Sequence, residues 1–172
     1  MYIKHKVKLS TWSVIISVLI LLVLSGLLLY FADSGNMLLL WLIAIFMVAW
    51  CFTGLYYAPL AISVDNKALT VHRPLRIKDF PISEIESVKM CAPTMAERRI
   101  CGSGGFFGYW GWFSEKGIGR YFAYYGKSSD CFLVTLKNGR KYMLGCEKPA
   151  GIVKYLESRV GKRGRSKAAT SI

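Results

Sequence analysis

The feature that most constrains this chain is a stretch without any basic residue, from Thr11 to Val64, which contains two long apolar runs. Residues 11–32 carry no charged side chain, and residues 37–58 form a second uncharged run. As an α-helix, a run of this length rises about 33 Å, which is enough to cross the hydrocarbon core of a bilayer. Because a chain in lipid must satisfy its own backbone hydrogen bonds, the two runs predict transmembrane helices at about 11–32 and 37–58.

The two predicted helices are joined by a short polar turn at residues 33–36, so they must run antiparallel. Lys4, Lys6 and Lys8 precede the first helix, the turn carries no positive charge, and the segment after residue 58 is basic. The positive-inside rule therefore predicts that both chain ends are cytoplasmic, in a multi-pass protein of the inner membrane.

Two other interpretations of the apolar runs fit less well. A cleavable signal peptide would have a shorter apolar core before a cleavage site, whereas the first run continues through residues 27–31. A buried helical hairpin of a soluble protein would show an amphipathic pattern, which both runs lack. Only 19% of the residues are charged, against about 25% in a typical soluble domain. The 23 Lys and Arg against 10 Asp and Glu nevertheless give a net charge of +13, most of it after the second run.

Residues 59–160 have the length and the pattern of one small domain. Alternating apolar residues predict strands at 61–64, 69–72, 85–90, 119–125, 132–136 and 141–144. The last two flank Asn138-Gly139, a dipeptide typical of tight hairpin turns.

After Lys148-Pro149 a helix is predicted, and residues 161–172 follow it as a basic tail. The apolar face of this helix holds Ile152, Val153, Leu156 and Val160. Strands followed by one amphipathic helix predict an α+β fold in which an antiparallel sheet or barrel is capped by the helix.

The order of these elements resembles the bacterial pleckstrin-homology (PH) domain proteins that are anchored by two transmembrane helices. The most specific piece is Pro-Ile-Ser-Glu-Ile-Glu-Ser-Val at residues 81–88, where Ile82, Ile85 and Val88 follow the register of the family's strand entry. The resemblance implies a seven-stranded, partly open PH-like barrel closed at one end by the C-terminal helix. It implies a module that binds lipids or proteins, without a reaction. Eukaryotic relatives recognise phosphoinositides through a basic loop after the first strand. Residues 65–67 stand at that position here and hold a single base, so this mode of phosphoinositide recognition is not expected.

A segment rich in aromatic residues and glycine follows, at residues 102–126. Glycine permits tight loops, and a small barrel cannot bury so many rings in one connection, so some rings are expected at the surface. Two interpretations stay open: a loop that enters the inner leaflet or docks on a partner protein, or an internal cluster folded over one end of the barrel. In the first, the contact residues are Phe107, Tyr109, Trp110, Trp112 and Phe113.

Basic residues form two sets that can contact anionic phospholipid head groups, since each Lys or Arg near an anionic leaflet contributes about 1 kcal/mol. The first set is Arg73, Arg76 and Lys78, and the second is Arg159, Lys162, Arg163, Arg165 and Lys167. A solvated charged tail is the alternative for the second set. Nucleic acid is not an expected partner, because the chain has the charge for it but no recognition motif.

No catalytic, metal or cofactor site is predicted. The acidic residues are scattered, His72 is the only histidine of the domain, and the five cysteines lack metal-binding spacing. The glycines at 102–105 are not followed by the Lys-Ser/Thr pair of a phosphate loop. If Asn138-Gly139 is a two-residue turn, Cys131 faces Cys146 across the sheet, where two reduced thiols are expected in the cytoplasm.

The sequence therefore predicts a non-catalytic, membrane-anchored PH-like module that binds inner-leaflet lipid or a protein partner, as a scaffold or regulator. One alternative is an accessory subunit of a membrane transport or envelope complex, docked through its helix hairpin. A second alternative is an enzyme, for which the sequence shows no catalytic constellation.

Overall fold

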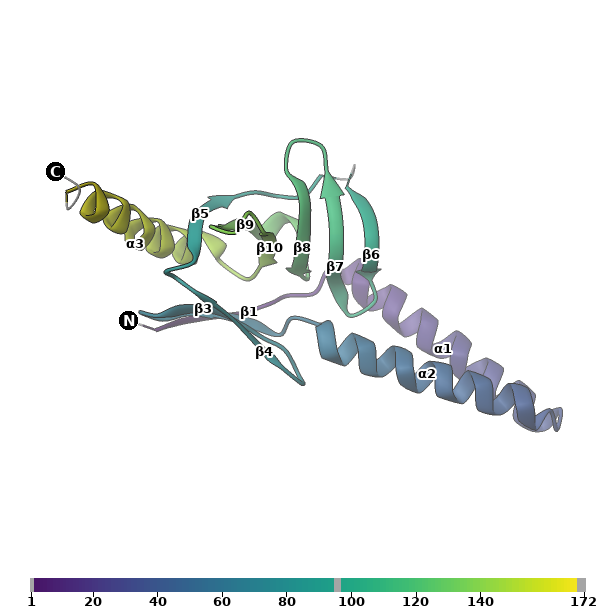
Figure 1. The fold of residues 1–172 in the computed structure, drawn as a ribbon. Coiled ribbons are helices and arrows are strands. Elements are labelled where there is room, and N and C mark those ends of the chain that lie inside the picture. The colour runs from purple at the N-terminus through teal and green to yellow at the C-terminus, as the bar shows by residue number, and fades with distance from the viewer. Residues whose placement is uncertain (1, 95–96, 170–172) are drawn as a thin grey trace.

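The computed structural model describes residues 2–94 and 97–169, with side chains up to residue 160. Helices α1 (Thr11–Asp33) and α2 (Met37–Tyr57) form a hairpin that projects from one end of a β-sheet unit (Figure 1). Helix α3 (Pro149–Ala169) projects from the opposite end, so the C-terminal part of the chain lies far from the helix hairpin.

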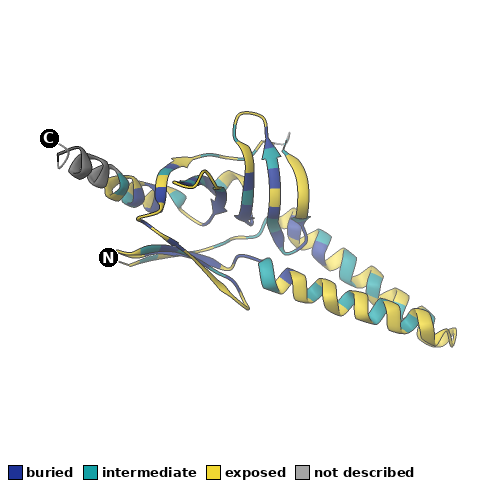
Figure 2. Ribbon diagram, viewed as in Figure 1, coloured by how far each residue is buried: buried dark blue, intermediate teal, exposed yellow. Residues whose placement is uncertain are grey.

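Both N-terminal helices are long and apolar enough to cross a membrane. Their side chains are mostly exposed along their whole length (Figure 2), as expected for apolar surface that faces lipid rather than a protein core. The Ser10 side chain caps α1 by accepting from the Ser13 amide at 3.1 Å, and Asn36 caps α2 in the same way. Helix α2 ends directly before Ala58-Pro59. The predicted hairpin of two apolar helices is confirmed, with bounds within one residue of those expected.

The first sheet has four antiparallel strands in the order β1-β2-β3-β4. Its strands are β1 (Ile3–Lys6), β2 (Ala61–Val64), β3 (Ala68–His72) and β4 (Ile77–Pro81). The hairpin of β2 and β3 was predicted, whereas β1 and β4 were not. Neither missed strand shows a clear apolar alternation in the sequence. Strand β1 reads Ile-Lys-His-Lys, and β4 reads Ile-Lys-Asp-Phe-Pro, of which only Phe80 is buried.

Strand β1 ties the start of the chain to the domain that follows the helix hairpin. It pairs with β2 in the register Ile3↔Val64 to Lys6↔Ala61. The Lys6 carbonyl then accepts from the Glu147 amide at 2.9 Å, beside the second sheet. The chain therefore leaves the β unit into α1 and returns to the same unit from α2.

The second sheet has six strands in the order β5-β9-β10-β8-β7-β6. Its strands are β5 (Ile85–Met90), β6 (Arg98–Gly105), β7 (Gly108–Glu115), β8 (Gly119–Tyr125), β9 (Cys131–Leu136) and β10 (Lys141–Gly145), with a 3₁₀ turn at Ser128–Asp130. Strands β10 and β8 are parallel, so this sheet is mixed rather than purely antiparallel. The described residues thus form two open sheets with ten strands, instead of the seven that the resemblance implies.

The main core lies between the two sheets and is closed by α3. Ile152 and Leu156 of α3 are fully buried in this core, as the predicted apolar face requires. From the sheets it includes Ile62, Val64, Leu69, Val71, Phe80, Phe132, Val134 and Leu144. The expected PH-like α+β fold with a capping helix is confirmed.

The turn between β9 and β10 differs from the predicted one by a residue. The Leu136 amide donates to the Arg140 carbonyl, and Gly139 has a φ of 77°, which is typical of a three-residue loop. Cys131 consequently pairs with Gly145, and the predicted pairing of Cys131 with Cys146 is wrong. Both thiols are free and buried, and burial raises the pKa of Cys146 to about 12.

The first part of the aromatic segment, up to residue 115, belongs to a β-hairpin of β6 and β7 rather than a loop, and the rest contains the predicted strand β8. Gly102 and Gly111 face each other across it with φ angles of 132° and 119°. A Cβ at either position would lie within 2.3 Å of the backbone of the opposite strand. Glycine here allows two strands to pair closely, so its abundance did not signal a loop.

Candidate functional site

The tip of the β6–β7 hairpin docks on both apolar helices, α1 and α2. The Phe107 amide donates to the Ser17 side chain of α1 at 3.0 Å, and the Phe106 ring packs edge-on against Trp50 of α2 at 5.8 Å. A Cβ added at Gly54 would lie only 2.7 Å from the Phe107 ring, so the ring lies directly on the α2 backbone. These contacts fix the helix hairpin against the second sheet.

The last turn of α2 packs on the next part of the same hairpin. Tyr57 stacks on Trp110 with a centroid separation of 5.0 Å and an angle of 10°. The Trp110 indole nitrogen donates to the Phe106 carbonyl at 3.1 Å, which holds the ring in place. This stacked pair therefore joins the end of α2 to strand β7.

The turn between β3 and β4 reaches the end of α2 from the first sheet (Figure 1). The Arg76 guanidinium donates to the Tyr56 hydroxyl at 2.8 Å. The Arg73 guanidinium lies 5.4 Å from the centroid of the Tyr56 ring, a distance at which a cation is attracted to the ring face. Leu75 and Ile77 beside them are more than half exposed, so the turn presents bases and apolar side chains together.

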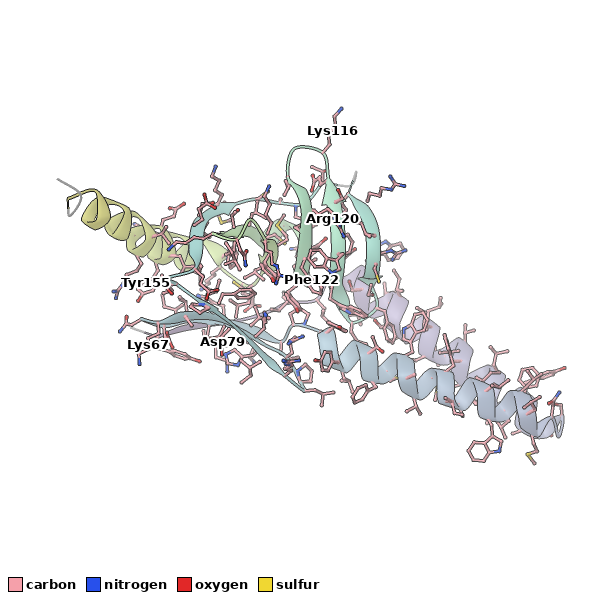
Figure 3. The ribbon with its side chains drawn as sticks, in the orientation of Figure 1. Lys67, Asp79, Lys116, Arg120, Phe122 and Tyr155 are labelled. Carbon is pink, nitrogen blue, oxygen red and sulfur yellow. The ribbon has the colours of Figure 1, made fainter. Side chains whose placement is uncertain are left out.

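These elements enclose a cavity of about 310 Å³, here called the basic–aromatic pocket. Phe122, one of its lining residues, lies between the two sheets (Figure 3). The pocket is lined by Tyr56, Tyr57, Arg73, Arg76, Ile77, Lys78, Trp112, Phe122, Tyr124 and Tyr142. All ten are described residues, three are bases and none is acidic.

Arg73 is the electrostatic centre of this pocket. It is only 8% exposed, and its Nε has no hydrogen-bond partner among the described residues. Its Nη1 donates to the Tyr124 hydroxyl at 3.4 Å, and burial raises the pKa of Tyr124 to about 12, which keeps that hydroxyl neutral. A buried cation with an unsatisfied donor is costly, and the described residues that line the pocket include no carboxylate. An anion entering the pocket would lower that cost.

Four of the predicted contact residues therefore meet in one place: Arg73, Arg76, Lys78 and Trp112 all line the basic–aromatic pocket. The sequence did not associate Tyr124 and Tyr142 with them. The available signal was the alternation of apolar residues along β8 and β10. That alternation indicates which residues share one face of a strand, but it does not indicate which face meets the bases.

The other predicted aromatic contacts lie elsewhere. Phe107 and Trp110 contact the chain's own helices. Tyr109 stacks on Tyr125 at 4.8 Å, on the other face of the sheet. Phe113 is 2% exposed in a second, smaller core cluster and so faces the protein interior.

The second basic set starts on α3, away from the pocket. The Arg159 guanidinium donates to the Asn66 side chain at 2.9 Å, as does the Tyr155 hydroxyl at 2.8 Å. These bonds join α3 to the β2–β3 turn, at the end of the domain opposite the helix hairpin (Figure 1). The side chains of Lys162, Arg163, Arg165 and Lys167 lie outside the described residues.

Comparisons with known proteins identify one match. The sequence profile of the bacterial PH domain family matches residues 60–160, which contain β2 to β10 and the first part of α3. Searches of curated proteins and of solved structures found no match. In the described part of the chain, no cluster of His, Cys, Asp or Glu side chains is arranged to hold a metal ion.

Proposed function

This chain belongs to the bacterial PH domain family, and we propose that it is a non-catalytic module that binds the anionic head groups of the membrane in which α1 and α2 are inserted. In this proposal both chain ends are cytoplasmic, and the basic–aromatic pocket faces the inner leaflet. Family membership supports a binding role rather than a reaction, since PH-like domains are generally non-catalytic.

The observation that carries the proposal is the position of three bases at the end of a membrane helix. Arg73, Arg76 and Lys78 line a pocket whose other walls are aromatic and include Tyr56 and Tyr57, the last two residues of α2. Tyrosine at a helix end is typical of the level of the lipid head groups. Bases held at that level lie well within the range over which an anionic leaflet attracts them.

The uncompensated charge of Arg73 supports a phosphate as the ligand. A guanidinium binds phosphate oxygens through several donors at once, and Arg73 has a buried Nε without a partner. The exposed side chains of Leu75 and Ile77 on the same turn would lie in the apolar part of the interface. A turn that presents both basic and apolar side chains suits a membrane surface, where anionic head groups lie above an apolar interior.

A protein partner is the second candidate, and strand β6 favours it. Strand β6 is at the edge of its sheet, and residues 98–102 are exposed. An exposed edge leaves backbone groups that another strand can pair with. An accessory subunit of a larger membrane complex could use this edge as well as the lipid-facing surfaces of α1 and α2.

The test is native mass spectrometry of the full chain, released from nanodiscs that contain phosphatidylglycerol and phosphatidylcholine in equal amounts. The chain is expected to retain phosphatidylglycerol preferentially. Exchanging Arg76→Gln and Lys78→Gln together should lower that preference by about thirtyfold, because two bases that each contribute about 1 kcal/mol at the interface are lost. Both side chains are exposed, so the fold should survive.

The matched control removes two bases that do not line the pocket, by Lys116→Gln and Arg140→Gln. Lys116 lies on the turn between β7 and β8, at the side away from the helices (Figure 3). The control should leave the lipid preference unchanged. Equal retention of both lipids by the unmodified chain, or equal effects of the two double variants, would contradict the proposal, and a copurifying protein would favour the second candidate.

A further inference from the structure

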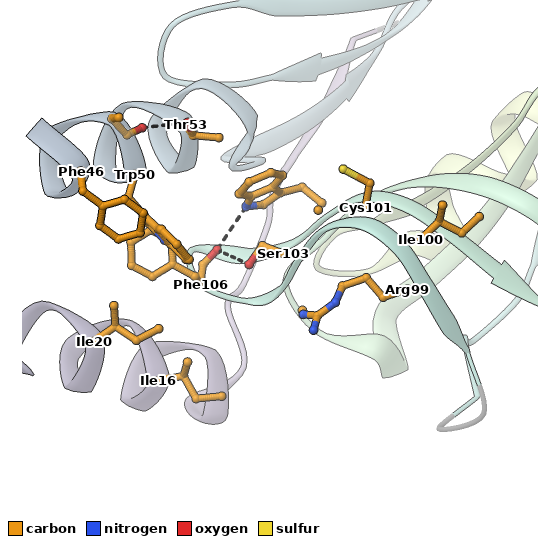
Figure 4. A pocket seen from close by; sticks show the side chains of 14 residues that line it. Ile16, Ile20, Phe46, Trp50, Thr53, Arg99, Ile100, Cys101, Ser103 and Phe106 are labelled. Atoms are coloured by element: carbon orange, nitrogen blue, oxygen red, sulfur yellow. Dashed lines mark hydrogen bonds between the residues drawn. The ribbon is translucent and has the colours of Figure 1, made fainter.

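A larger cavity, of about 740 Å³, lies between α1, α2 and strand β6 (Figure 4). We call it the helix–hairpin cleft. Its helix side is lined by Ile16, Ile20, Phe46, Ala49, Trp50 and Thr53. Residues 99–104 of β6 line the other side, with Phe106 and Trp110 between.

The depth of the cleft corresponds to one leaflet of the bilayer. Ile20 lies nine residues into α1 and Phe46 lies eleven residues before the end of α2. At 1.5 Å per residue these positions are about 14 and 16 Å below the domain end of the helices, close to half of a core about 30 Å thick. The apolar floor therefore reaches from the head-group level to the middle of the membrane.

The hairpin tip holds this cleft open. Phe106 packs against Trp50 of α2 at 5.8 Å, and Gly105 approaches Ile16 of α1 so closely that a Cβ there would lie 3.3 Å from the Ile16 side chain. The Ser103 hydroxyl donates to the Phe106 carbonyl at 3.0 Å, which fixes the tip. The separation of the two helices at this level is thus part of the fold.

The domain end of the cleft carries one positive charge. Arg99 is the only charged residue among those that line it, all of which are described. Its guanidinium lies over Gly104, where an added Cβ would be 2.9 Å from Nη1. Among the described strands β6 pairs with β7 alone, so it forms an edge of its sheet. A guanidinium at the rim of an apolar cleft suits a phosphate.

We propose that the helix–hairpin cleft binds one acyl chain of an anionic membrane phospholipid, with the phosphate at Arg99. This site is separate from the basic–aromatic pocket, because the stacked Trp110 and Tyr57 stand between them. The proposal goes beyond head-group recognition, since it assigns a bound lipid to the space inside the membrane hairpin. A partner helix would not by itself place an anion at Arg99, so a phospholipid is the occupant that the charged rim favours.

The experiment uses the full chain in nanodiscs that contain phosphatidylglycerol with a diazirine on one acyl chain. After illumination, peptide mass spectrometry locates the crosslinks, which should concentrate on residues 16–20 and 46–53. Ala49→Phe fills the cleft and should remove these crosslinks. The matched control is Ala44→Phe, since Ala44 is on the same helix but outside the cleft and should leave them unchanged.

The charged rim is tested by comparing diazirine-labelled phosphatidylglycerol with labelled phosphatidylcholine. Arg99→Gln should lower the preference for phosphatidylglycerol in the cleft by about fivefold, the effect of one base near an anionic lipid. Arg98→Gln is the control, because Arg98 is exposed on the same strand but does not line the cleft.

Three results would overturn the proposal: crosslinks spread evenly over the lipid-facing surface, crosslinks that persist in Ala49→Phe, or crosslinks to another polypeptide. Arg76→Gln with Lys78→Gln should leave crosslinking in the cleft unchanged. Loss of lipid preference in that double variant together with intact cleft crosslinking separates this site from the basic–aromatic pocket.

Discussion

At the scale of single residues, the junction between membrane helices and domain depends on the absence of a side chain at Gly54. The Phe107 ring occupies the space that a Cβ would need, 2.7 Å away. Phe107 itself has a φ of 52°, a left-handed conformation that is unfavourable for a residue other than glycine. The contact of its ring with α2 and the hydrogen bond that its backbone amide donates to the Ser17 hydroxyl compensate for that backbone cost.

We predict that Gly54→Leu separates the hairpin tip from α2 and lowers the stability of the full chain by about 1–3 kcal/mol, the usual cost of overpacking. The measurement is unfolding of the detergent-solubilised protein, followed by tryptophan fluorescence. Gly26→Leu is the matched control, since Gly26 lies in α1 with no atom within 4 Å of an added Cβ. Equal losses in both variants would show that the Phe107 contact has no part in stability.

At the scale of elements, β1 joins the segment before α1 to the domain after α2. Ile3 and Val7 pack against the main core, although they precede the membrane hairpin in sequence. The β1–β2 ladder therefore requires that both ends of the helix hairpin emerge on the same side of any membrane that α1 and α2 cross. This agrees with the even number of helices and is independent of the charge distribution.

Replacing Ile3 and Val7 together by Ala should destabilise the domain, by about 1 kcal/mol for each half-buried side chain. Hydrogen exchange should also become faster in β2, because its partner strand is held less firmly. Tyr2→Ala is the control, since the Tyr2 side chain is 62% exposed. If the double variant behaves like the control, β1 is only loosely attached and the N-terminal segment is not an integral part of the sheet.

The elements that could be predicted from the sequence are those in which the pattern of apolar and polar residues shows directly which side chains avoid water. The helices were identified by uncharged length, and β2, β3, β5, β8, β9, β10 and α3 by apolar periodicity. Strands β6 and β7 were missed because their glycines serve close strand pairing at Gly102 and Gly111, which a local pattern cannot distinguish from a loop. Strand β1 was missed because its partner is more than fifty residues away.

The candidate site was predictable to a similar degree. The sequence indicated which bases could contact lipid, because charge near a membrane segment is a local property. It could not tell that Arg73 would meet Tyr56 and Tyr124, since that depends on how two sheets pack at the end of α2. It also treated Arg159 as equivalent to Arg73, although α3, which carries Arg159, and the turn between β3 and β4, which contains Arg73, lie at opposite ends of the domain.

At the scale of the whole molecule, the bases are divided between two ends. Arg73, Arg76 and Lys78 lie where the helices meet the sheets, while Arg159 lies on α3, which points away from the helix hairpin. Of the predicted bases whose side chains are described, Arg73, Arg76 and Lys78 lie at the end of the two apolar helices and Arg159 does not. The central claim is therefore that anionic lipid is recognised at the turn between β3 and β4, at the end of α2.

The most direct test is hydrogen exchange of the full chain in nanodiscs of phosphatidylcholine alone, compared with nanodiscs that contain phosphatidylglycerol. Anionic lipid should slow exchange at residues 73–78, where head groups would cover the turn, and leave the β7–β8 turn and α3 unchanged. Unchanged exchange at 73–78, or slowing confined to α3, would contradict the claim and assign any lipid contact to the other end of the domain.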